Sequence, residues 1–258
     1  QRRPLSATDR SRLLAEMTDD VAEHVLANNR AHNRALREAE HDAAIMTDVH
    51  ARMIADLEAR RGLHRELEHL PTAAEFTELA RTGRGLTRPQ LATLMAHTKL
   101  DLKARLLAEE DFDDPYFDAA LRRYFPARLR REFGDDFGRH PLRREISATA
   151  VVNHLVATSG LTYVFRLQEE TGAGVGEIVR AHAVVSSVFA LDELWRGLYD
   201  ARLRPDTTNA LVLEARRLLD RGSRWFLYNR PQPLRIEDEV ARFAGQVAAL
   251  RGKLSAML

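Results

Sequence analysis

The sequence predicts an all-α protein, an irregular multi-helix bundle with long amphipathic helices and no sheet. Three observations lead to this class. The chain has only 13 glycines and 9 prolines in 258 residues, fewer than turn-dense β folds use. Helix start signals recur along its length. Between them, apolar residues are spaced by three and four positions in almost every segment, which is the period of a helix.

The composition excludes several classes of protein. Hydrophobic residues make up 45% of the chain, which is enough for one large domain or two small ones and too much for a disordered protein. No cysteine is present, so a disulfide framework, a thiolate metal site and a cysteine nucleophile are excluded. A reducing cytoplasm fits this composition. Basic and acidic residues number 39 and 38, which disfavours a surface that binds polyanions over its whole extent.

The first 70 residues predict two long helices. Ser6 or Thr8 can cap the first, which carries Leu14, Met17, Val21 and Val25. The second is expected over roughly 33–61. Its inward-facing positions form a narrow seam of the coiled-coil kind. These positions are Leu36, Ala39, Ala43, Met46, His50, Met53 and Leu57.

Five start signals follow in the middle of the chain. Thr72 with Glu75 forms a capping box, and that helix is expected to end near Gly83. Thr87 with Gln90 repeats the motif and opens a helix that reaches about residue 109. Prolines at 115, 126 and 141 each mark the start of a further helix, because the missing N–H of proline costs nothing in a first turn.

An uncharged stretch from 146 to 165 is long enough to span a membrane. It contains many hydroxyl and amide side chains, as well as His154, and these cost free energy in hydrocarbon unless they are paired. We therefore expect a helix buried within the protein, ending near Gly160. After Gly176 an amphipathic stretch continues to Leu198, and another helix is expected from Asp206 or Thr207.

The last segment is the most regular in the chain. Its apolar residues step by four and three without interruption, so this helix needs a partner in the same chain or in another. They are Ile236, Val240, Phe243, Val247, Leu250, Leu254 and Met257. The chain begins without methionine and ends within this repeat, from which we expect it to be part of a longer polypeptide.

Two kinds of catalytic or cofactor site find little support. No two of the ten histidines are three or four residues apart, the spacing that places two metal ligands on one helix face. The six histidines before residue 70 are expected on the solvated surface. Residues 172–176, GAGVG, look like a phosphate-binding loop, but the third glycine comes one residue early and the preceding segment is charged. We expect a loop between helices there.

Two charge blocks point to binding. Residues 109–118 hold six acids, and residues 121–144 hold eight arginines mixed with aromatic residues. Arginine with aromatics is typical of protein interfaces, and we favour that interpretation for Arg128, Arg130, Arg131 and Phe133. The acidic block would supply a partner within the chain or on a neighbouring subunit. The alternatives are a helical nucleic-acid-binding regulator, which would use the arginine block and a helix-turn-helix-like segment at 72–107, or an adaptor that docks through the 236–257 seam.

Several blocks in the same order resemble the large bacterial NAD-specific glutamate dehydrogenases, in the region that follows their dehydrogenase domain. They include LLAEMTDDV at 13–21, RPQLA at 88–92, DPYF at 114–117, HPLRREI at 140–146, EETGA at 169–173, LDELW at 191–195 and RW at 224–225. The resemblance covers roughly residues 10–230. It implies a multidomain polypeptide with N-terminal regulatory regions, a central catalytic domain and a helical C-terminal region, assembled as a homo-oligomer in the cytoplasm.

The resemblance also implies that catalysis takes place in a different part of that polypeptide. The whole enzyme would convert L-glutamate, NAD and water to 2-oxoglutarate, ammonia and NADH. The catalytic lysines of the family match nothing here, since Lys99, Lys103 and Lys253 lie on amphipathic helices. We therefore expect no catalytic, cofactor-binding or metal-binding residue in this chain. Residues 1–70 would adjoin the catalytic domain of the same polypeptide, and 71–258 would form the C-terminal helical domain, with no nucleic-acid or membrane partner.

Overall fold

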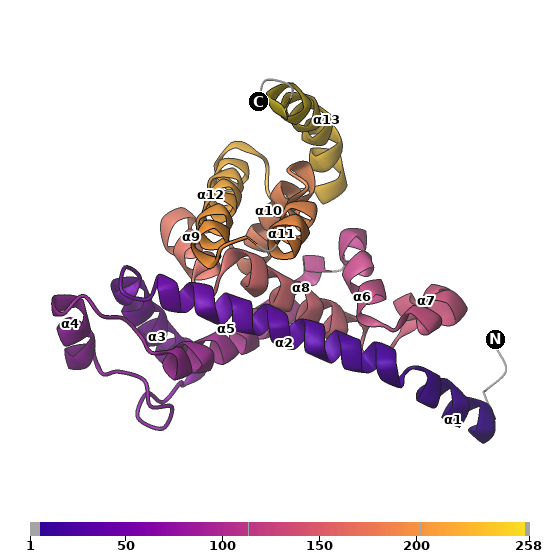
Figure 1. Cartoon of the computed structure of the whole chain (residues 1–258), viewed down its shortest axis with the longest axis horizontal. Helices are drawn as coiled ribbons and strands as arrows, with labels where there is room; N and C mark the ends of the chain where they lie inside the picture. The colour runs from indigo at the N-terminus through magenta and orange to yellow at the C-terminus, as the bar shows by residue number, and fades with distance from the viewer. Residues whose placement is uncertain (1–5, 113, 202, 256–258) are drawn as a thin grey trace.

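The computed structural model describes residues 6–112, 114–201 and 203–255, and within them it contains 13 α-helices, three short 3-10 helices and no strand (Figure 1). The all-α prediction is confirmed. The long helix α2 lies across α5 and α8, α3 packs against α5, and α4 packs against α3. Above this layer, α10 is surrounded by α9, α11, α12 and α13.

The N-terminal helices are α1 (Ala7–Glu16), α2 (Thr18–His41) and α3 (Thr47–Arg61). The Ser6 hydroxyl accepts a hydrogen bond from the Asp9 N–H at 3.1 Å, as its capping role requires. The expected first helix is divided at Met17 into α1 and α2. The expected single helix over 33–61 is wrong, because residues 42–46 form a turn. A tertiary contact fixes this turn. The Thr47 hydroxyl donates to the carbonyl of Arg84 at 3.0 Å, and the backbone of Gly85 lies directly against that of Ala43.

Both predicted capping boxes begin helices, α4 (Ala73–Arg81) and α5 (Arg88–Ala108). The Glu75 carboxylate accepts from the Thr72 N–H at 2.7 Å, and the Thr72 hydroxyl accepts from the Glu75 N–H at 3.3 Å. The Gln90 carbonyl oxygen accepts from the Thr87 N–H at 2.9 Å. These starts were predictable because the satisfied groups belong to residues only three positions apart.

The central segment contains α6 (Asp118–Tyr124), α7 (Ala127–Phe133), α8 (Arg143–Ser159) and α9 (Tyr163–Thr171). The helix α8 packs against α2, α5 and α6 and stops before Gly160, whose φ of 88° suits glycine. The expected buried helix is therefore confirmed. Across the described ranges, no helix is both long and apolar enough to cross a membrane.

The C-terminal segment contains α10 (Val175–Val188), α11 (Leu191–Asp200), α12 (Pro205–Asn229) and α13 (Ile236–Ser255). Nearly every side chain of α10 is buried, since α10 packs against four neighbouring helices and α5. The uninterrupted stretch expected from Gly176 to Leu198 is wrong. Ala190 adopts a left-handed conformation, with φ of 51°, and turns the chain so that α11 packs against both α10 and α12.

Candidate interface surfaces

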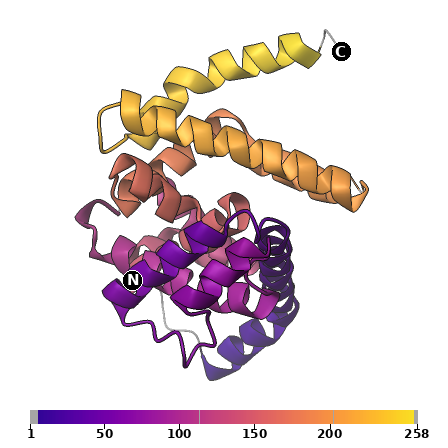
Figure 2. The ribbon, with the colours of Figure 1, turned by 90° about the vertical axis from the view of Figure 1, so that its left-hand side faces the viewer.

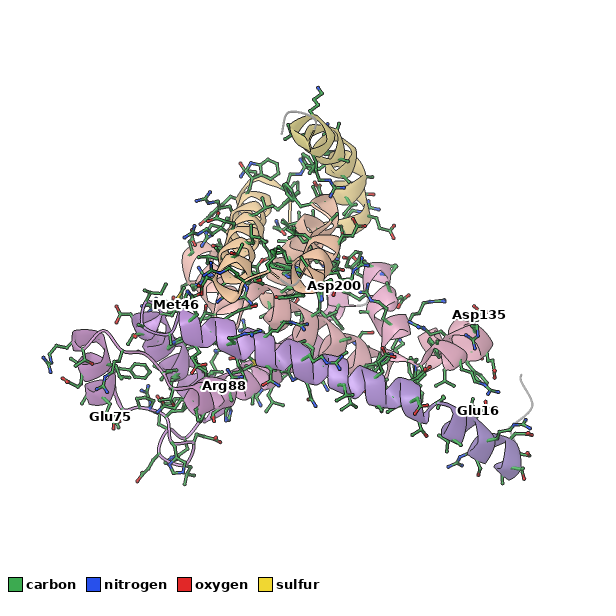
Figure 3. The ribbon with its side chains drawn as sticks, in the orientation of Figure 1. Glu16, Met46, Glu75, Arg88, Asp135 and Asp200 are labelled. Atoms are coloured by element: carbon green, nitrogen blue, oxygen red, sulfur yellow. The ribbon has the colours of Figure 1, made fainter. Side chains whose placement is uncertain are left out.

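The predicted interface residues of the arginine block lie on one short helix, α7. Arg128 forms an ion pair with Glu16 at the end of α1, labelled in Figure 3, and its Nε donates to Glu132 at 2.9 Å. Arg130 and Arg131 are exposed. Phe133, at the end of the same helix, is half-buried. The helix thus presents two guanidinium groups to solvent, and its role in subunit contact stays a prediction.

The acidic block takes its partners from other helices. Asp114 caps the turn that follows it, accepting from the Tyr116 N–H at 2.9 Å, and forms an ion pair with the buried Arg180 of α10. Arg144 of α8 donates to the Glu109 carbonyl at 2.9 Å. These contacts join the 109–118 segment to α8 and α10. The side chain of Asp111 and the whole of residue 113 lie outside what the structure describes.

The glycine-rich segment at 172–176 joins α9 to α10, as expected. Its helix N-terminus accommodates a carboxylate of the same chain, because the Gly176 N–H donates to Glu109 Oε1 at 2.8 Å. A Cβ at position 176 would lie 1.6 Å from Glu109 Oε2, so glycine is what lets this side chain approach. The positive end of the helix dipole favours the negative charge held there.

The predicted seam of the last helix is used unevenly. Ile236 is 1% exposed, and Val240, Phe243 and Val247 are half-buried residues that pack against the core. Leu250, one step further along the seam, is 58% exposed. The side chains of Leu254 and Met257 lie outside the described residues. α10 of the same chain is therefore the partner of the first half of the seam, and the second half extends beyond it.

A second apolar stripe lies on α12, the helix expected from Asp206 or Thr207. Leu211, Leu218 and Trp225 are 41%, 36% and 45% exposed. They are seven residues apart and so share one face of the helix, whereas Leu219 is fully buried. The seven-residue spacing in the sequence already indicated that these three residues share one face. Periodicity alone could not separate the buried face of α12 from this uncovered one.

Buried ion pairs join helices that are far apart in sequence. Glu38 of α2 pairs with Arg216 of α12, and it accepts from the Tyr199 hydroxyl at 3.1 Å. Arg216 Nε also donates to the Thr158 carbonyl at 2.9 Å. Burial and the neighbouring Glu38 charge raise the pKa of Tyr199 to about 12. Glu38 is thus a buried carboxylate whose charge is compensated inside the protein.

Two titratable groups near α2 and α3 are also withdrawn from water. Lys99 Nζ lies 2.6 Å from His32 Nε2, and burial lowers the pKa of Lys99 to about 8. Burial also lowers the pKa of His50, to about 4. His50 is 2% exposed, so the expectation that all histidines before residue 70 lie on the surface is wrong. The position of His50 in the predicted seam indicated its burial correctly.

The described residues hold no cluster of three side chains able to bind a metal ion. An open groove of about 710 Å³ lies beside α4. Arg65 at its edge is already held by Glu58 through two contacts of 2.7 Å. The helix-turn-helix-like segment forms α4 and α5. Much of α5 faces the protein interior, where Leu91, Leu94 and Leu102 are buried.

These observations define an all-helical region in which several ion pairs join one helix to another and uncovered apolar residues lie on its outer helices. A family model described as "Glutamate dehydrogenase, C-terminal" matches residues 83–258. The chain belongs to this family.

Three similar proteins are each named NAD-specific glutamate dehydrogenase. The chain is 43% identical to the protein of Mycobacterium tuberculosis, 38% identical to that of Pseudomonas aeruginosa and 35% identical to that of Halomonas elongata. Each alignment covers 98% of this chain and 16% of the relative. The chain therefore corresponds to a small part of these large proteins, and the resemblance seen in the sequence blocks is confirmed.

Proposed function

We propose that this chain is the non-catalytic helical region of an NAD-specific glutamate dehydrogenase that acts in the cytoplasm. The whole enzyme converts L-glutamate, NAD and water to 2-oxoglutarate, ammonia and NADH, and it binds NAD in a part of the polypeptide outside this chain. The observation that carries the proposal is the similarity over nearly all of this chain to proteins of that name, of which it spans only 16%.

The proposed role is to pack against the catalytic domain, to position it, and to contribute contacts between subunits. The helices α1 and α2 support the first part of this role. Val21 and Val25 of α2 are 47% and 53% exposed and, four residues apart, lie on one face of that helix. Leu14 of the preceding helix α1 is 54% exposed. Large side chains gathered in this way favour a protein contact over open solvent. The catalytic domain of the same polypeptide is the partner that we assign to them.

The non-catalytic role is tested on the isolated chain. We expect a helical circular dichroism spectrum, no formation of NADH from L-glutamate and NAD, and no heat of NAD binding by calorimetry. The full-length enzyme, measured in parallel, supplies the positive control. Turnover or saturable NAD binding by the isolated chain would contradict the proposal.

The positioning role is tested in the full-length enzyme. Replacing Val21 and Val25 together by aspartate places two charges in the proposed contact, and charges are costly to desolvate. We expect turnover to fall by roughly tenfold to a hundredfold, the scale on which small misplacements affect catalysis. Ala27→Asp, on the opposite exposed face of α2, is the matched control and should leave turnover unchanged. Equal effects of the two variants would count against this contact.

A further inference from the structure

The helices α12 and α13 diverge from the short segment that connects them. Figure 2 shows both leaving this junction on the outer side of the molecule, with α13 the outermost. Both pack against α10. Near the junction the rings of Trp225 and Phe243 meet edge to face, with centroids 5.7 Å apart. The two helices therefore form a V, and the rings of Trp225 and Phe243 are in contact near its narrow end.

Apolar side chains follow both arms away from this junction. Trp225, Leu218 and Leu211 lie along α12, and Val247 and Leu250 continue the seam of α13. Single exposed apolar residues are ordinary, but two ordered rows on neighbouring helices are typical of a protein contact. The exposed fraction of the α13 row rises towards its free end, where Leu250 is 58% exposed. Among the described residues, the outer half of this surface is thus left uncovered.

The charges of α13 indicate what that partner is. Its first turn carries Glu237 and Asp238, of which Asp238 forms an ion pair with Arg235 at 3.0 Å. Its last turns carry Arg251 and Lys253, and all four side chains are exposed. A parallel copy of this helix would bring like charges together. An antiparallel copy brings the basic end of each helix beside the acidic start of the other, so the same favourable contact forms twice. This self-complementarity is what a two-fold symmetric interface requires.

We propose that the outer face of α12 and α13 binds a second copy of this chain. In this dimer α13 of each copy runs antiparallel to α13 of the other, and its outer half enters the angle between α12 and α13 of the partner. Leu250 then covers the row of Trp225 and Leu218. The inference rests on the proposed function, because it assigns the subunit contacts included there to a defined surface.

The apolar part of the contact is tested by sedimentation of the full 258-residue chain over a range of concentrations. We expect a reversible monomer–dimer equilibrium. Leu250→Ser should weaken association by about tenfold or more, since each tenfold corresponds to only about 1.4 kcal/mol. Ala248→Ser, an exposed position two residues away on a different face, is the matched control and should leave it unchanged. A monomeric chain, or equal effects of the two variants, would overturn the proposal.

The antiparallel arrangement is tested by charge reversal. The variant Glu237→Lys with Asp238→Lys and the variant Arg251→Glu with Lys253→Glu should each weaken the dimer by about tenfold, because like charges then meet. Their combination should restore association to within about threefold of the original, although it makes the helix dipole interactions worse at both ends. Circular dichroism of each variant shows that α13 still forms. A combined variant weaker than either parent would overturn the arrangement.

These measurements distinguish a failure of the dimer from a failure of the proposed function. Turnover by the isolated chain would contradict the non-catalytic role and leave the dimer intact. Loss of the dimer would leave the assignment to the dehydrogenase family intact.

Discussion

At the scale of single residues, Gly176 is constrained by the carboxylate of Glu109. We predict that Gly176→Ala destabilises the chain by about 1 kcal/mol, because the new methyl group displaces Glu109 and ends its hydrogen bond to the helix N-terminus. Urea-induced unfolding measures this change. Gly197→Ala, in α11 with nothing near its Cβ, is the control and should stabilise by about 0.5–1 kcal/mol.

The same pair of residues offers a second check. In a chain that already carries Glu109→Ala, the substitution Gly176→Ala has no carboxylate to displace. It should then cost nothing or stabilise slightly, as alanine normally does in a helix. An unchanged cost in that background would mean that another contact makes glycine necessary.

His50 gives the chain a predictable response to acid. Burial lowers its pKa to about 4 in the folded chain, so between its ordinary value of 6.5 and about 4 the unfolded chain binds more protons. Stability therefore falls as the pH falls through this window. We predict that His50 contributes about 2–3 kcal/mol to the loss between about pH 7 and about pH 4.5. In the His50→Leu variant, the unfolding free energy should therefore lose about 2–3 kcal/mol less over the same pH range. Denaturant unfolding curves recorded at several pH values measure this difference.

Met53, which is buried on the same helix and carries no titratable group, provides the comparison for His50. Met53→Leu should leave the pH dependence of the unfolding free energy as it is. If His50→Leu left it equally unchanged, the protonation of His50 would not be linked to unfolding.

At the scale of helices, Ala190 separates α10 from α11 in a conformation that costs an L-residue roughly 1–2 kcal/mol. We predict that Ala190→Gly stabilises the chain by about 1 kcal/mol, because glycine adopts this conformation without strain. Thermal unfolding measures the gain. Ala201→Gly, at the end of α11 with φ of −70°, should give no gain. A loss at Ala190 would show that its methyl group contributes packing that outweighs the strain.

Helix starts and helix breaks differ in how far the sequence predicts them. The starts at Thr72 and Thr87 were predictable, because each cap is satisfied by a residue three positions later. The turn at 42–46 was not, because it is fixed by Arg84 and Gly85, some 40 residues away in the sequence. Distant contacts override local helix propensity at such places.

At the scale of the whole molecule, the ion pair of Glu38 with Arg216 links α2 to α12. We predict that Arg216→Met destabilises the chain by about 3–5 kcal/mol, because it leaves a buried carboxylate without its counter-charge. Adding Glu38→Gln should recover part of this loss, since the uncompensated charge is then removed. Denaturant unfolding of both single variants and the double variant measures the coupling.

The neighbouring pair of Arg217 with Glu214 is the control on the same helix. Its side chains are 53% and 66% exposed, so water already solvates both charges. Arg217→Met should cost about 0–1 kcal/mol. Equal costs at Arg216 and Arg217 would indicate that burial does not strengthen the first pair.

The packing of the first 70 residues is likewise a property of the whole molecule. The helix α2 contacts α5 and α8, and α3 contacts α4 and α5. The helices on either side of residue 70 therefore share an extensive packing surface. A domain boundary at that residue stays a prediction.

The sequence by itself determined the helical class, the capped starts, the buried character of α8 and the family, because each depends on neighbouring residues or on ordered sequence blocks. The tertiary structure alone decided which apolar faces are covered. Ile236 and Leu250 belong to one regular seam, yet the first is buried against the core and the second is exposed. A periodic pattern shows that a face is apolar. What lies against that face depends on how far the neighbouring helices extend, and no local pattern encodes this.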